Sequence, residues 1–312
     1  MVFLTFHIGV NHDNFIGSCD HSLFFLPLPL EIQNRTMQLH TIHAGYFSCD
    51  GGSLFSVIPK AMWNKVYPAN ENNIVQLVLR CLLVDLGDRK ILIEAGVGNH
   101  YSEKVQQNNG HRGTDAIEKS LAEKGYRVED ITDVMFTHLH WDHCNGAVLN
   151  VNGQLKLQFP KATHWCSKRQ WEHSQVSNIR ERAAYYLEIL NFLKTEGNMQ
   201  LVEDNCQLFP DISVRMFDGH TPGQMIPFIH SGDKTYVYMS DLIPTTANIP
   251  IVWLASYDLY PVTALEEKEA FLKEAADYNY ILFFEHDYYT QCATVQWGER
   301  GPKVKEKFSL YQ

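Results

Sequence analysis

The sequence predicts one layered domain that mixes helices and sheets, an α/β fold of the α+β layered type. Strand-like segments form two groups along the chain, and helical segments follow each group. We find no internal repeat, no low-complexity tract and no linker rich in proline, glycine or serine. Such an order favours sheets and helices packed in layers around a shared core. With 312 residues, of which 45% are hydrophobic, the chain can bury such a core.

The first group of elements lies before residue 196. A strand is expected to begin at Met37, and two aliphatic strands at 76–84 and 90–94 flank a turn at Gly87-Asp88. Residues 116–124 have helical spacing, and a short strand follows at 133–137. The longest helix is expected at 178–195, where the apolar residues share one face: Ala183, Tyr186, Leu187, Leu190 and Leu193.

The second group begins at residue 212. Three strands are expected, at 212–217, 225–229 and 235–239. A helix over 264–278 carries Glu266 and Glu267 in its first turns, and a last buried strand follows at 281–284.

Composition excludes several classes of partner. The formal net charge is −10 and the pI is near 5.8, which argues against nucleic acid and offers no basic patch for an anionic membrane surface. No apolar run reaches the ~18–20 residues of a membrane helix. Seven cysteines, scattered and without CxxC spacing, indicate free thiols in a reducing compartment, so we expect a cytoplasmic protein.

Residues 1–36 differ from the rest. They contain no lysine or arginine before Arg35, so they lack the positive segment of a signal peptide. We expect either that Met37 is the natural start or that residues 1–36 form a poorly ordered N-terminal arm, followed by a single hydrolase domain over residues 37–312.

The stretch THLHWDHCNGA at 137–147 carries the chemistry. Its ligand candidates are His138, His140, Asp142 and His143. Three more follow downstream, namely His220 in GHTPG, Asp241 in SD and His286 in FEHD. Each group comes directly after a short apolar strand, and loops at one edge of a sheet bring functional side chains together.

These residue types suit two zinc ions, since imidazole and carboxylate bind zinc at about 2.0–2.2 Å. His138, His140 and His220 would face one ion, and Asp142, His143 and His286 the other. Asp241 would bridge the two ions, which can share an activated hydroxide. Other divalent metals would fit the same donors.

In this order, the motifs HxHxDH, GHTPG, SD and FEHD resemble those of the metallo-β-lactamase superfamily, from about Met37 onward. The resemblance implies a four-layer αββα sandwich with the metals at the edge of its two sheets, and the same ligand assignment. One departure is Glu94-Ala95-Gly96, where many members carry an aspartate, a small residue and glycine. That acid usually lies outside the metal ligands, so the change bears on their positioning.

Residues 49–60 and 241–258 are similar to segments of the lactonase-like branch, which includes quorum-quenching acyl-homoserine lactonases and methyl parathion hydrolase. We expect the first segment to be a loop. The expected cleft has an aromatic wall: Phe55, Trp63, Trp253, Tyr257 and Tyr260. Trp141 is expected to pack near the ligands or line the cleft, and Cys144 to be a small buried residue.

The expected reaction opens a small-molecule ester or lactone, best matched by an N-acyl-homoserine lactone. The shared hydroxide attacks the carbonyl while the zinc ions hold the carbonyl oxygen and the leaving alkoxide. The expected catalytic residues are Asp241, which orients the hydroxide, Asp142, and Tyr257 as a hydrogen-bond donor to the carbonyl.

Three alternatives stay open at this point. The first is an arylesterase or phosphotriesterase of the same fold. The second is a persulfide dioxygenase with a single iron, and the third is a binding module without catalysis. The oligomeric state is also open, with a homodimer as one option.

Overall fold

The computed structural model describes residues 37–113 and 115–310. The arm expected over residues 1–36 lies outside the described residues. Two mixed sheets and the helices that cover them make up the described part of the chain. In that part, no helix has the length and apolar character needed to cross a bilayer.

The first sheet has six strands in the order β1-β2-β3-β4-β7-β8. Its first three strands are antiparallel, and the pairs β3-β4, β4-β7 and β7-β8 are parallel. The bounds are β1 Gln38–Asp50, β2 Ile74–Asp85, β3 Lys90–Ile93, β4 Asp133–Met135, β7 Thr163–Ser167 and β8 Met199–Val202.

The second sheet has seven strands in the order β15-β14-β13-β12-β11-β10-β9. All neighbours are antiparallel except β12 and β13, which α8 (Pro261–Asp277) connects. The bounds are β9 Cys206–Phe209, β10 Ile212–Phe217, β11 Gln224–Ser231, β12 Lys234–Tyr238, β13 Ile281–Phe283, β14 Cys292–Gly298 and β15 Gly301–Phe308.

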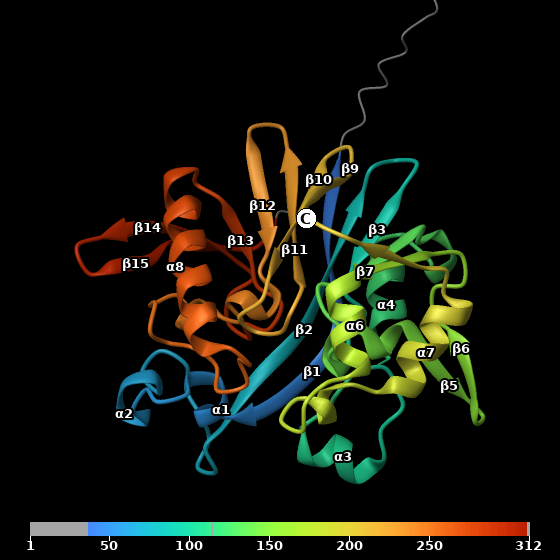
Figure 1. Cartoon of the computed structure of the whole chain (residues 1–312), viewed down its shortest axis with the longest axis horizontal. Helices are drawn as coiled ribbons and strands as arrows, with labels where there is room; N and C mark the ends of the chain where they lie inside the picture. The colour runs from blue at the N-terminus through green and yellow to red at the C-terminus, as the bar shows by residue number, and fades with distance from the viewer. Residues whose placement is uncertain (1–36, 114, 311–312) are drawn as a thin grey trace, which may run out of the picture. The chain divides into compact units, whose positions relative to one another are not determined.

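Helices cover the outer face of each sheet. Figure 1 shows α8 beside the second sheet, with α4 (Ala116–Glu123), α6 (Lys168–Gln175) and α7 (Leu187–Glu196) on the opposite side, next to the first. The smaller elements are α1 Gly51–Phe55, α2 Lys60–Trp63, α3 Glu103–Asn108, α5 Trp141–Cys144, and the hairpin β5 Val148–Val151 with β6 Gln154–Leu157.

Side chains that alternate along the strands build three apolar clusters, one for each contact between layers. Met135 on β4 and Phe283 on β13 pack in the cluster between the sheets. Val134 packs in the cluster that contains Leu121 of α4 and Leu190 of α7. Leu282 packs in the cluster that contains Phe271 of α8. Three clusters separate four layers, so the αββα sandwich is confirmed.

Two expectations about local structure were wrong. Helix α7 begins only at Leu187, so the predicted helix over 178–195 loses its first half, and α8 is the longest helix described. Before α7, residues Arg182–Ala184 form a 3-10 turn, and the Glu181 carboxylate contacts His140 and His173. Residues 51–55, expected in a loop, form the short helix α1, which Asp50 caps by accepting a hydrogen bond from the Gly52 amide at 2.7 Å.

Candidate metal centre

The loop after β4 carries four of the seven predicted ligands. The chain leaves the strand at Met135 and reaches His140, the residue that precedes the one-turn helix α5. His138 and His140 therefore lie before the helix, whereas Asp142 and His143 lie on it. The turn separates the four side chains into two pairs.

A glycine allows this loop to pack against the end of β3. The Ala95 amide donates to the His143 carbonyl at 2.8 Å, and the Gly146 amide donates to the Gly96 carbonyl at 2.9 Å. A Cβ atom on Gly146 would lie 1.9 Å from the Ala95 carbonyl oxygen. Only glycine permits this approach, which explains the NG that follows the histidines in the motif.

The other three predicted ligands come from the second sheet. His220 lies between β10 and β11, Asp241 follows β12, and His286 follows β13. Ser240, directly before Asp241, has a left-handed backbone with φ of 43°. Such a conformation is unfavourable for serine and is typical of functional turns.

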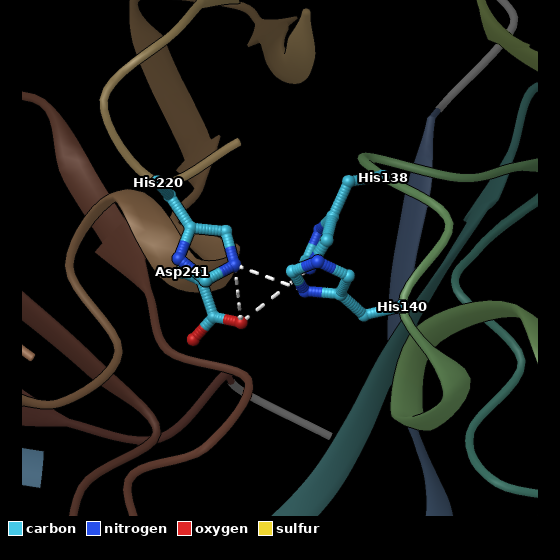
Figure 2. A group of neighbouring side chains, drawn as sticks. All are labelled: His138, His140, His220 and Asp241. Carbon is cyan, nitrogen blue, oxygen red and sulfur yellow. Dashed lines mark hydrogen bonds and ion pairs between the residues drawn. The ribbon is translucent and has the colours of Figure 1, made fainter. Parts of the chain in front are cut away.

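His138, His140, His220 and Asp241 form the first ligand group, shown in Figure 2. Their ligand atoms all lie within 4.8 Å of one another. The Asp241 Oδ2 atom is 3.4 Å from His220 Nε2 and 3.6 Å from His138 Nε2. The His140 Nδ1 atom is 3.2 Å from His220 Nε2.

Asp142, His143 and His286 form the second group, also within 4.8 Å. His143 Nε2 lies 3.6 Å from Asp142 Oδ1 and 3.3 Å from His286 Nε2. Asp241 contacts this group too, with Oδ1 3.7 Å from His286 Nε2 and Oδ2 3.1 Å from His143 Nε2. The Asp241 carboxylate therefore lies between the two groups.

The donor atoms fit divalent cations. Within the described chain, His138 Nε2 and Asp241 Oδ1 are buried and have no hydrogen-bond partner, which costs roughly 1–3 kcal/mol per atom. Two pairs of imidazole nitrogens, 3.2 and 3.3 Å apart, also face each other. Cations bound by these nitrogens and carboxylates would satisfy the unpaired atoms.

The opposite nitrogen of each imidazole lies next to a polar group, which helps to orient the ring. His140 Nε2 faces Glu181 at 3.0 Å, His220 Nδ1 faces Asp258 at 3.0 Å and His143 Nδ1 faces Glu285 at 3.1 Å. Two further contacts are His286 Nδ1 to the Val78 carbonyl at 3.1 Å and His138 Nδ1 to the Thr137 hydroxyl at 3.0 Å.

The surrounding charges shift the pKa values of the carboxyl groups. Burial acts to raise the pKa of Asp241, but His220, His286 and His143 outweigh it and hold that pKa well below the usual range. At Glu181, burial is likewise outweighed by His140, Thr221 and His173, so its pKa is also lowered. Both groups are therefore carboxylates at neutral pH.

A cleft of about 730 Å³ opens above the two groups. His140, Asp142, His220, Asp241 and His286 all line it. Its apolar wall consists of Phe47, Ile74, Leu77, Trp141, Tyr257 and Leu259. A volume of this size suits a small organic molecule.

The predicted aromatic wall was correct for Tyr257, whose ring centroid lies 5.7 Å from that of His220. Phe55 and Trp63 are instead fully buried and stack on each other at 5.1 Å, and Trp253 packs on Phe55. Tyr260 is 47% exposed and does not line the cleft. The pattern of polar and apolar residues in the sequence does not distinguish aromatic side chains that face the core from those that line the cleft.

The sequence model of the metallo-beta-lactamase superfamily matches residues 79–286, which is more than half of the chain. The protein belongs to the metallo-beta-lactamase superfamily. The resemblance of its motifs to those of this superfamily is thereby confirmed. The superfamily is one of metal-dependent hydrolases.

Curated relatives of this superfamily member include N-acyl homoserine lactonases. The one from Bacillus cereus is 25% identical over 233 residues, which cover 69% of this chain and 83% of the relative. The one from Bacillus thuringiensis subsp. kurstaki is 25% identical over 235 residues, with the same coverage. The suspected resemblance to the lactonase-like branch is thereby confirmed.

Solved structures of hydrolases share the fold. A probable metal-dependent hydrolase from Staphylococcus aureus aligns with a TM-score of 0.79 and 29% identity, over 89% of this chain and 98% of that chain. A dizinc quorum-quenching lactonase aligns with a TM-score of 0.74 and 23% identity, over 88% of this chain and 96% of that chain.

Glu94, where many superfamily members carry an aspartate, is completely buried at the end of β3 with φ of 67°. Its Oε1 atom accepts from the Thr137 amide at 2.9 Å and lies 3.6 Å from His143 Nδ1. Glu94, His138 and His143 also have ligand atoms within 4.8 Å of one another. Because Thr137 already donates to Oε1, we interpret Glu94 as a support for the loop and for His143.

Sequence reasoning missed Glu181 and Asp258 as partners of the ligand histidines. Glu181 lies in a segment that seemed helical, and nothing in its neighbourhood marks it. Asp258 lies in the 241–258 segment that is similar to lactonases, but no role was predicted for it. The expectations for Trp141 and Cys144 were met, since Trp141 lines the cleft and Cys144 is fully buried and belongs to neither ligand group.

Proposed function

We propose that this protein is a hydrolase with two divalent ions, zinc by preference, that opens the lactone ring of an N-acyl-homoserine lactone or a closely similar ester. The observation that carries the proposal is the place of Asp241. Its carboxylate lies between two histidine groups, at a cleft with an apolar wall. A bridging carboxylate is the arrangement that a two-ion hydrolase needs.

His138, His140 and His220 would hold one ion, and Asp142, His143 and His286 the other, with Asp241 shared. The charge around these residues supports two ions. Carboxyl groups of Glu94, Glu181, Asp258 and Glu285 add to those of Asp142 and Asp241, and all but Asp142 are buried. Buried carboxylates are costly without cations, so bound divalent ions would stabilise this cluster of acidic side chains.

Bound divalent ions would supply an activated water and a Lewis acid for the carbonyl oxygen. Asp241 orients the attacking water and carries a proton to the leaving alkoxide. Tyr257 donates a hydrogen bond to the carbonyl oxygen from the cleft wall. Burial and the nearby Asp241 raise the pKa of Tyr257 well above its usual value, so its hydroxyl stays protonated and can donate.

The lining of the cleft supports an uncharged substrate with an apolar tail. Among the described residues that line it, Arg180 is the one arginine or lysine. Its Nη2 atom already donates to the carbonyl oxygens of Ser256 and Asp258. Anionic substrates need free cationic groups, whereas an acyl lactone needs an apolar wall and a polarised carbonyl. The curated relatives act on such a lactone.

The test is metal content together with a substrate panel. Protein purified without added metal is analysed for zinc, iron and manganese, then assayed on acyl-homoserine lactones of several chain lengths, aryl acetates and a paraoxon-like triester. We expect two zinc ions per chain and lactone opening at least tenfold above the other substrates. Preferred hydrolysis of the aryl acetate or the triester would overturn the lactone assignment. One iron with oxygen uptake on glutathione persulfide would overturn the reaction class.

A further inference from the structure

Arg80 is a buried cation in an apolar strand. It lies on β2 between Leu79 and Cys81, and only 6% of it is exposed. A buried guanidinium is costly unless its donors are paired. An aliphatic residue would pack at this position without that cost. The hydrogen bonds of Arg80 therefore indicate the role of the buried charge.

The guanidinium binds carbonyl oxygens of a single loop, the one that follows β13. Its Nη1 atom donates to Phe284 at 2.5 Å, to Asp287 at 3.1 Å and to Thr290 at 3.5 Å. Its Nη2 atom donates to Asp287 at 3.1 Å. These carbonyls lie on both sides of His286, so one side chain holds both ends of the turn that carries the predicted ligand.

Asp287 holds the same turn from the other side. Its Oδ1 atom accepts from the amides of Tyr289 and Thr290 at 2.9 and 2.8 Å. Its Oδ2 atom accepts from the Thr246 amide at 2.8 Å and from the Thr246 hydroxyl at 2.6 Å. The loop is thus fastened to the segment after Asp241 as well as to β2.

The ring of His286 depends on this attachment to β2. Its Nδ1 atom donates to the Val78 carbonyl at 3.1 Å, and the Val78 amide donates to the His286 carbonyl at 3.3 Å. Val78 is two residues from Arg80 on the same strand. A shift of the loop along β2 would therefore break the bond at Nδ1, and Nε2 would no longer point at Asp142 and His143.

We propose that Arg80 is a positioning residue for the ion held by Asp142, His143 and His286. It sets the distance between the 284–290 loop and β2, which fixes the Nδ1-protonated form of His286 and leaves Nε2 free for the ion. This inference rests on the second ion of the proposed function. The three histidines of the first group lie on other loops, which the hydrogen bonds of Arg80 do not reach.

The test compares Arg80→Met, which keeps the length of the side chain without the donors, with Arg80→Lys, which keeps the charge. Arg215→Met is the control, because Arg215 pairs with Glu274 at 2.8 Å and its side chain is 39% exposed. Nitrogen-15 histidine spectra of the metal-free full chain report the His286 tautomer, assigned with His286→Gln. Stepwise zinc competition by a chelator reports the affinity of each ion.

In the wild type and the control we expect a single Nδ1-protonated His286 signal. In Arg80→Met we expect a mixture of tautomers and about 10–100-fold weaker binding of one ion, with the other unchanged. Arg80→Lys should fall between the two. An unchanged tautomer with unchanged ion affinities in Arg80→Met would overturn the inference, as would equal weakening of both ions.

If Arg80→Met does not fold, Arg80→Lys decides, and wild-type behaviour of that variant overturns the proposal. Loss of folding in both variants also overturns it, because Arg80 would then be a determinant of the whole fold. If the wild type binds a single ion, the two-ion function fails by itself. The tautomer of His286 in the metal-free protein still tests the role of Arg80 independently.

Discussion

The Oε1 atom of Glu181 lies 3.0 Å from Nε2 of His140, on the side of the ring opposite the ligand group. The second carboxylate oxygen lies 2.5 Å from Nε2 of His173. Thr221, next to His220, also donates to Oε1 at 2.6 Å. Glu181 therefore orients one predicted ligand directly and is tied to the loop of another.

Replacing Glu181 by glutamine should weaken the first ion site. Glutamine has nearly the same shape but no negative charge to stabilise the Nε2-protonated ring of His140. We expect about 10–100-fold weaker metal binding or activity. Chelator competition would measure it, with Glu172→Gln as the control, an exposed neighbour on α6. Equal affinity in the Glu181 and Glu172 variants would contradict this role.

Replacing Asp142 or His286 by alanine should remove one of the two ions and most of the activity. Each variant deletes a donor of the second group, whereas the donors of the first group remain. Elemental analysis should give one ion per chain in place of two. The exposed Asp204→Ala variant is the control, and an unchanged ion count in the Asp142 or His286 variant would refute the ligand assignment.

Removal of the metal should silence the enzyme and lower its melting temperature. Ions that bind only the folded chain stabilise it by about 2.7 kcal/mol per site at a free concentration 100 times the Kd. Treatment with a chelator followed by calorimetry checks this, and added zinc should restore both properties. A melting temperature that does not change on chelation would count against a metal at this centre.

Replacing Tyr257 by phenylalanine should lower kcat and leave the metal content unchanged. The variant removes one hydrogen-bond donor to the developing oxyanion, which typically costs about 10²–10³-fold in kcat. KM should change little, because the aromatic wall is kept. Tyr278→Phe is the control, since Tyr278 is 71% exposed. A Tyr257→Phe enzyme with wild-type kcat would remove Tyr257 from the mechanism.

Lys268 on α8 should make stability depend on pH. Burial lowers the pKa of this lysine from 10.5 to about 7, although Asp258 opposes the shift. Between these two values the unfolded chain binds more protons than the folded chain, so the free energy of unfolding contributed by Lys268 rises with pH. Below pH 7 both states are protonated and the full cost of the buried charge remains.

Urea unfolding at pH 7.5 and pH 9.5 would test the effect of Lys268. From pH 7.5 to pH 9.5, the unfolding free energy of the wild type should rise relative to that of Lys268→Met. Lys273→Met is the control on the same helix, since the side chain of Lys273 is 64% exposed. Identical pH slopes in wild type and Lys268→Met would show that the buried amine does not titrate in this range.

The sequence was sufficient to predict that the seven candidate ligands lie close together, because they follow apolar strands and belong to short motifs. His220, Asp241 and His286 lie far apart in the chain, yet strand ends at one sheet edge bring them together. The two groups of strands likewise predicted the layers.

The supporting residues could not be found in the same way. Glu181 contacts His140 across a distance of 41 residues, and Arg80 reaches the 284–290 loop from more than 200 residues away. No local pattern encodes such contacts. Helical periodicity at 183–193 even concealed Glu181, which lies before the start of α7 at Leu187 and contacts His140 and His173. Phe55 and Trp63 were misplaced because aromatic residues suit a core and a cleft equally well.

The position of the centre between the two sheets has a consequence for the nascent chain. Residues 138–143 are made early, His220 and Asp241 later, and His286 last, after the whole of α8. Before β13 and the residues after it have been synthesised, the second group lacks His286. The donors of the first group are therefore all synthesised before α8, whereas the second group is completed only when His286 has been added, after most of the fold.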